Sequence, residues 1–288
     1  MDSEMLFSNL CPCESGKDFS TCCEPYTSLL HKVERLDETV LLSWINRYSL
    51  PIQDSFKKKA STIVFRISIY ADIVFESLYL LGFRLFRHDQ ENLDESFRAA
   101  KHNIMLSLFA SLSCLSQGLF LQSGSLIRCC IEDSLVLLDL SEHDSQLIKF
   151  LSGNYLANNV LKRVKQFIPK NFLRWYGHYS ANFIHFGPFH TAPYIPRACY
   201  PDNYVLGSGL ENLLLAMYMI HVVLERAHFN QLQKPFFWIS HNKSYPEFQE
   251  NNIITQYVHN LQKEIYLKFH PDKREKGYSY TSKTYRAK

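Results

Sequence analysis

Apolar residues recur at spacings of three and four along most of the chain, and this spacing limits its fold more than any other feature. Between residues 54 and 87 they occupy most of a helix circumference, and residues 208–229 are almost continuously apolar. Strand-like alternation is weak everywhere except in PFFWIS, residues 235–240. The sequence therefore predicts an all-α fold, an antiparallel bundle of about seven or eight helices.

Prolines and capping residues divide this pattern into separate helices. Pro51 and Pro169 stop the helices that precede them, and pairs such as Asn92 with Glu95 have the form of a capping box. Four prolines between residues 187 and 207 predict a long irregular segment, of a length that is often functional. The predicted helices cover residues 27–48, 54–87, 92–121, 125–140, 145–168, 208–229 and 244–269.

Residues 103–127 contain no Lys, Arg, Asp or Glu and are long enough to span a bilayer. Serines and glutamines interrupt the stretch, and Gly118 and Gly124 lie near an expected helix break, so we favour a buried helical hairpin over a membrane span. The first ten residues have no basic region and no long apolar core of a secretory signal. We expect a cytoplasmic protein with reduced thiols and no stable membrane insertion.

Four of the eight cysteines fall within CPCESGKDFSTCC, residues 11–23. Cys11, Cys13, Cys22 and Cys23 supply the four soft thiolates that tetrahedral zinc takes in a closed structural site. Because such a site keeps no open position for water, hydrolytic zinc chemistry is not expected. The segment predicts a zinc knuckle, with Zn²⁺ as cofactor.

This segment resembles the SEC-C motif, known from the C-terminus of the SecA translocation ATPase. The proline, the Gly-Lys pair and the aromatic residue of the motif are present as Pro12, Gly16-Lys17 and Phe19, and Glu14 replaces the usual glycine. The resemblance implies that the four cysteines ligate zinc. It also implies that Lys17 and its neighbours form a docking surface for a protein or a ribosome.

A second group of polar residues lies in the helical part. Arg128 and Glu132 are four residues apart on one predicted helix and are surrounded by apolar neighbours, so the pair must be satisfied internally or face a cleft. RWYGHYSANFIHFG adds His178 and His185, seven residues apart. These four residues form either a catalytic acid/base site or a polar network that fixes helix register.

The helical part, over residues 60–190, also weakly resembles bacterial helical proteins of the HEPN type found in abortive-infection systems. HEPN ribonucleases carry an Arg and a His separated by four to six residues. The three pairs in this chain have only three intervening residues, and they are Arg84 with His88, Arg98 with His102, and Arg174 with His178.

Residues 268–288 form a basic tail, with seven Lys or Arg against Asp272 and Glu275. Tyrosines lie between the basic residues, which suits contact with phosphates and stacking on bases. A solvated tail without a partner is the alternative.

The sequence thus predicts a knuckle over residues 1–25, a helical domain over 26–267 and the tail. Our preferred hypothesis is a zinc-binding interaction protein whose knuckle docks the helical domain to a protein, ribosome or RNA/DNA partner in stress or phage defence. The alternative is a toxin-like ribonuclease that uses Arg128, Glu132, His178 and His185. Either protein could be a homo-oligomer.

Overall fold

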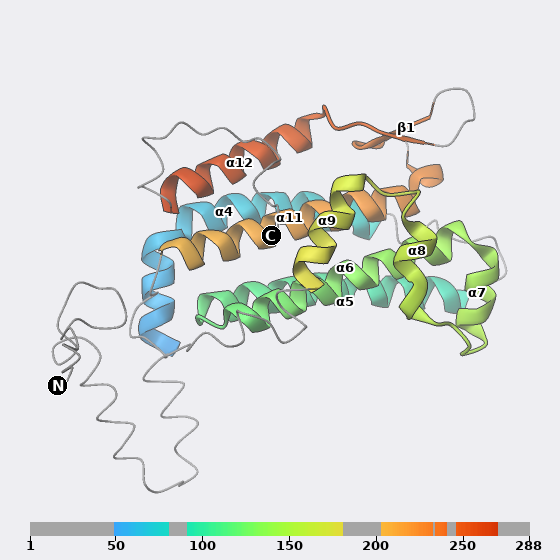
Figure 1. The fold of residues 1–288 in the computed structure, drawn as a ribbon, viewed down its shortest axis with the longest axis horizontal. Coiled ribbons are helices and arrows are strands. Elements are labelled where there is room, and N and C mark those ends of the chain that lie inside the picture. The colour runs from blue at the N-terminus through green and yellow to red at the C-terminus, as the bar shows by residue number, and fades with distance from the viewer. Residues whose placement is uncertain (1–48, 81–90, 181–202, 233, 241–245, 270–288) are drawn as a thin grey trace, which may run out of the picture.

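A computed structural model describes residues 49–80, 91–180, 203–232, 234–240 and 246–269. Within these residues the chain is almost entirely helical, which confirms the all-α prediction (Figure 1). The predicted zinc knuckle, the helix over 27–48 and the basic tail after Phe269 lie outside the described residues. The elements are α4 (Leu50–Leu80), α5 (Glu91–Ser116), α6 (Phe120–Glu142), α7 (Asp144–Leu151), η3 (Ala157–Asn159), α8 (Val160–Val164), α9 (Lys170–Tyr179), α11 (Asn203–Ala227), η5 (Phe229–Gln231), β1 (Trp238–Ile239), β2 (Glu247–Phe248) and α12 (Ile253–Phe269).

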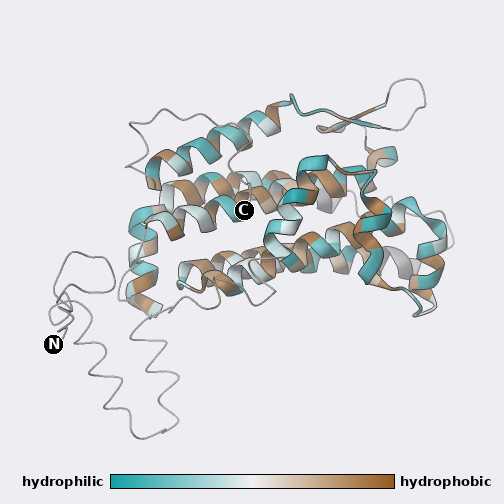
Figure 2. Ribbon diagram, in the orientation of Figure 1, coloured by the Kyte–Doolittle hydropathy of each residue, from teal (hydrophilic) through white to brown (hydrophobic). Residues whose placement is uncertain are grey.

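Helix α11 is the centre of the core. It packs against α4, α5, α6 and α12 (Figure 1). Its residues from 213 to 226 are nearly all buried, and its apolar residues are coloured brown in Figure 2. A Cβ on Gly209 would lie 2.4 Å from the Cδ1 atom of buried Leu115, so glycine permits the close approach of α11 to α5. We predicted a central helix from residue 54, but α4 has an exposed face, with Phe65 66% and Ile69 40% exposed. The prediction also started α11 five residues too late.

Helix α11 is also long and apolar enough to cross a membrane by composition alone, over Tyr204–Ala227. However, 72% of its most apolar window is buried inside the fold. It also carries buried Glu225 and Arg226. Its apolar character is therefore explained by its place in the core.

Helices α5 and α6 form the predicted helical hairpin. The turn between them lies at residues 117–119, where Gly118 has φ +78° and the Leu119 N–H donates to the Cys114 carbonyl at 2.8 Å. Glycine adopts this left-handed conformation without a Cβ penalty, as at many helix C-termini. We predicted the break near Gly118 and Gly124, with the next helix from residue 125. Gly124 instead lies buried inside α6.

Two further predicted helices were wrong in extent. The helix predicted over 145–168 is interrupted, because the chain turns at Gly153, with φ +73°, between α7 and α8. The helix predicted from Ser244 begins only at Ile253. The Asn252 side-chain oxygen accepts the Thr255 N–H at 2.8 Å and caps its first turn.

The residues before α12 form a two-stranded antiparallel sheet instead. Trp238 pairs with Phe248, and Ile239 pairs with Glu247. The first strand lies within PFFWIS, where the sequence showed its strongest strand signal. Phe237 and Trp238 are buried, and the Trp238 ring lies edge-on to Phe248 with centroids 5.5 Å apart. The sheet thus covers part of the core next to α11.

Candidate functional site

The predicted pair Arg128 and Glu132 forms an ion pair on α6. A guanidinium nitrogen of Arg128 lies 2.7 Å from a carboxylate oxygen of Glu132, as expected for residues one helical turn apart. The Tyr176 hydroxyl on α9 donates a hydrogen bond to Glu132 Oε1 at 2.6 Å. It also accepts a 3.3 Å hydrogen bond from Arg128. The three side chains therefore close a polar triangle between α6 and α9.

The triangle is half-buried. The side chains of Arg128 and Glu132 are 16% and 36% exposed, and the guanidinium carbon of Arg128 lies 5.7 Å from the Tyr176 ring centroid. Burial and the hydrogen bond to Glu132 raise the pKa of Tyr176 to about 12, so its proton stays on the hydroxyl at neutral pH. Tyr179 anchors the same helix to α11 by donating to the Asn212 carbonyl at 2.8 Å. The triangle thus belongs to the attachment of α9.

His178 lies on α9, two residues after Tyr176. Residues two apart on a helix do not face each other, so His178 lies on a different face of α9 from Tyr176. Its ring lies 5.9 Å from the Tyr179 ring, and burial lowers its pKa. His185 lies outside the described residues. Of the four predicted catalytic residues, the structure brings together Arg128 and Glu132, and it adds Tyr176, which the sequence reasoning missed.

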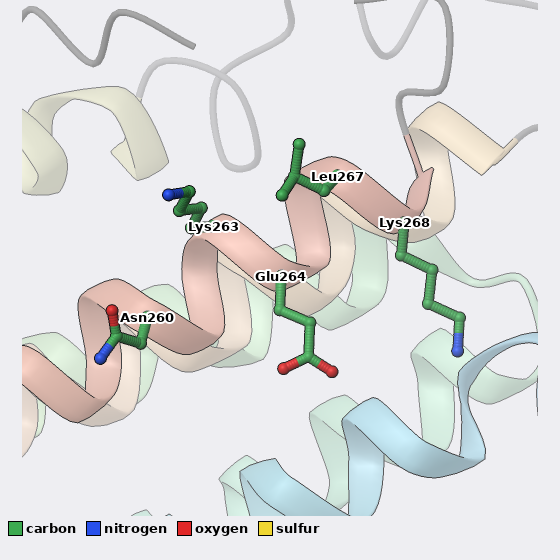
Figure 3. Close-up of a pocket in the computed structure, with 5 residues that line it drawn as sticks. All are labelled: Asn260, Lys263, Glu264, Leu267 and Lys268. Atoms are coloured by element: carbon green, nitrogen blue, oxygen red, sulfur yellow. The ribbon is translucent and has the colours of Figure 1, made fainter. Parts of the chain in front are cut away.

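A hollow of about 360 Å³ lies on another part of the surface, along α12 (Figure 3). All of its lining residues come from that one helix, and Glu264 and Lys268 reach toward α4. Glu264 forms an ion pair with Arg66 of α4. None of the predicted catalytic residues lines this hollow. The lining residues are Asn260, Lys263, Glu264, Leu267 and Lys268.

A larger polar network, also missed from the sequence, centres on Asp139 near the end of α6. The Asp139 side chain is fully buried, and Arg163 of α8 donates to both of its oxygens, at 2.6 and 2.8 Å to Oδ2 and 3.1 Å to Oδ1. The Tyr155 hydroxyl donates to it at 2.8 Å, and His143 Nδ1 lies 3.0 Å away. A lone acid in the apolar run LVLLDL was the available signal, because a buried carboxylate needs partners.

Glu225 forms a third buried polar centre, at the sheet. One carboxylate oxygen accepts the backbone N–H of Phe237 at 2.6 Å and that of Trp238 at 3.2 Å. Burial raises the pKa of Glu225, and these backbone hydrogen bonds act in the opposite direction. The adjacent Arg226 pairs with Glu142 of α6 at 2.6 Å. Together these carboxylates attach the sheet to α11 and α11 to α6.

His221 of α11 and His228, the residue that follows α11, are both buried. Burial lowers the pKa of His221 and of His228 to about 3, so both rings are neutral at pH 7. His221 lies 3.3 Å from the Tyr70 hydroxyl, and His228 lies 3.4 Å from the Lys101 ammonium. Among the described residues no group of three or more His, Cys, Asp or Glu could hold a metal ion.

Comparison with known proteins gives one match. Residues 8–25 match the family model of the SEC-C motif, which confirms the predicted resemblance of the cysteine-rich segment. No curated protein and no solved structure matches the chain. The weak resemblance of the helical part to HEPN-type proteins therefore has no support from these comparisons.

The SEC-C motif is associated with zinc binding, and the residues present suit that metal. The matched segment contains Cys11, Cys13, Cys22 and Cys23, and four thiolates are a complete ligand set for tetrahedral zinc. When bound, zinc would cross-link this segment as a structural ion. These residues lie outside the described part of the chain.

Proposed function

We propose that the protein is a zinc-binding interaction protein in which the SEC-C knuckle docks a helical domain to a partner. The match of residues 8–25 to the SEC-C motif carries this proposal. Four protein ligands saturate zinc, so the knuckle serves as a shaped surface and supplies no reaction chemistry. The partner is a protein, a ribosome or a nucleic acid, and the setting is stress response or phage defence in the cytoplasm.

The arrangement of the polar groups in the helical domain favours a scaffold role for this domain over a catalytic one. Arg128, Glu132 and Tyr176 pair with one another, and Asp139 and Glu225 are each surrounded by donors that hold neighbouring elements in place. Buried carboxylates with several donors stabilise one arrangement of helices. We therefore propose that the helical domain over residues 26–267 is the scaffold, that residues 1–25 are the docking knuckle and that residues 268–288 are a basic tail.

The ribonuclease hypothesis has weaker support. General acid/base cleavage needs two titratable groups near one phosphate. Arg128 and Glu132 engage each other and Tyr176, and His178, two residues after Tyr176, lies on a different face of α9. If the protein were a ribonuclease of this kind, purified chain would degrade cellular RNA, and His178→Ala or His185→Ala would stop the cleavage.

The docking role predicts that the cysteines are needed for partner binding and not for folding. Tagged full chain should retain its partners in a pull-down under reducing conditions, and the variant with all four cysteines changed to serine should lose them. The matched control is Cys114→Ser/Cys129→Ser, since both of these thiols lie on helices α5 and α6. Full partner retention by the four-serine variant would contradict the docking role.

A further inference from the structure

Helix α7 exposes apolar side chains that the fold does not explain. None of its eight residues is buried, although it lies in a well-packed helical protein. Ile148 is 67% exposed and Leu151 is 54% exposed, and residues three apart share one helix face. A helix this short gains its stability from packing of an apolar face. An apolar face left in solvent therefore indicates a binding surface.

The exposed apolar residues continue through the turn that follows α7. Leu156 is 66% exposed, and Phe150 is 41% exposed with its ring edge-on to Tyr155. Four of the twelve large exposed apolar residues in the described part of the chain thus fall within residues 148–156. Single exposed apolar residues are normal on a protein surface, but a cluster of four in nine residues is not.

The same end of the protein is basic. Residues 145–180 contain six Lys or Arg and no Asp or Glu, and the acid that precedes this stretch is Asp144, the first residue of α7. Arg163 is bound to Asp139, whereas Lys149 of α7 and Lys162 of α8 are exposed, as is Lys165 just after α8. Arg163 also donates to the Leu156 carbonyl at 3.2 Å, which places the exposed leucine beside the basic helix. Figure 1 shows α7 and α8 at one end of the bundle.

From this combination we infer that the α7–α8 end binds the surface of an anionic lipid bilayer. Exposed aliphatic side chains flanked by lysines suit the boundary between headgroups and acyl chains, where lysines contact anionic headgroups. RNA fits less well, because Ile148, Leu151 and Leu156 cannot stack on bases. A protein partner also fits less well, because lysine is depleted in protein interfaces. This binding is peripheral and goes beyond the docking role of the knuckle.

Vesicle co-sedimentation of the full chain tests the inference. The protein should sediment with vesicles of mixed phosphatidylcholine and phosphatidylglycerol, and high salt should weaken this binding. Vesicles of phosphatidylcholine alone should bind it at least about tenfold less. Equal sedimentation with both kinds of vesicle, or with neither, would overturn the inference.

Substitutions locate the surface. Ile148→Asn/Leu151→Asn and, separately, Lys149→Gln/Lys162→Gln should each weaken binding by about tenfold or more, because they remove the inserted side chains or the headgroup contacts. The control Phe65→Asn/Ile69→Asn removes a comparably exposed apolar pair of α4 and should leave binding unchanged. Far-UV circular dichroism confirms that each variant is folded. Loss of binding only in the α4 variant, or loss of single-stranded RNA binding without any vesicle effect in the α7 variants, would contradict the inference.

Discussion

Asp139→Ala should strongly destabilise the helical domain. The change removes the acceptor for Arg163 and for Tyr155. The side chain of Arg163 is only 22% exposed, and its charge is left without a partner. Breaking one side of a buried ion pair costs about 3 kcal/mol or more. For a domain of this size we expect the midpoint of thermal unfolding to fall by about 10 °C, measured by circular dichroism at 222 nm.

Asp139→Asn is the matched control, because it keeps the shape and an oxygen acceptor but removes the charge. Its effect should be intermediate, since one carboxylate oxygen that accepts from Arg163 is replaced by an amide. A midpoint for Asp139→Ala within about 2 °C of the wild type would show that the network around Asp139 does not hold α6 and α8 together.

Glu225→Ala should release the two-stranded sheet from α11. The carboxylate is the acceptor for two buried backbone N–H groups, those of Phe237 and Trp238. Leaving them unpaired costs about 2–4 kcal/mol in total. Trp238 is buried and its indole N–H donates to the Val222 carbonyl at 2.9 Å, so its detachment should shift tryptophan fluorescence to longer wavelength.

Glu225→Gln serves as the control, because its amide oxygen can still accept both backbone donors. It should retain the wild-type emission maximum and most of the stability. If Glu225→Ala kept the emission of the wild type, contacts other than this carboxylate would hold the sheet in place.

The sequence predicted the helical class and the hairpin of α5 and α6 because both depend on local spacing of apolar residues. It placed several boundaries wrongly where backbone conformation decides them. Gly118 and Gly153 adopt positive φ and end helices, whereas Gly124 is a normal helical residue, and composition alone does not distinguish these roles. The capping role of Asn252 was likewise missed, because the residues at Ser244 match the capping pattern better.

The polar networks were harder to predict, because they join residues far apart in the chain. Arg128 and Glu132 are one turn apart, so their pairing follows from sequence, but Tyr176 comes from 44 residues away. Phe172, Tyr176 and Tyr179 share a helical stripe at spacings of four and three, and this stripe was the available signal for the face that α9 presents to the core. Arg163 reaches Asp139 only through the packing of α8 on α6.

We propose that the SEC-C segment is a structural zinc site that the helical domain does not need for folding. The most direct test is the zinc content of purified full chain, measured by plasma mass spectrometry after dialysis under reducing conditions. We predict one zinc ion per chain in the wild type and in Cys114→Ser/Cys129→Ser, and none in Cys11→Ser/Cys22→Ser, with unchanged helix content in all three. A wild-type chain that retains no zinc, or a Cys11→Ser/Cys22→Ser chain that retains it fully, would contradict a structural zinc site at the SEC-C segment.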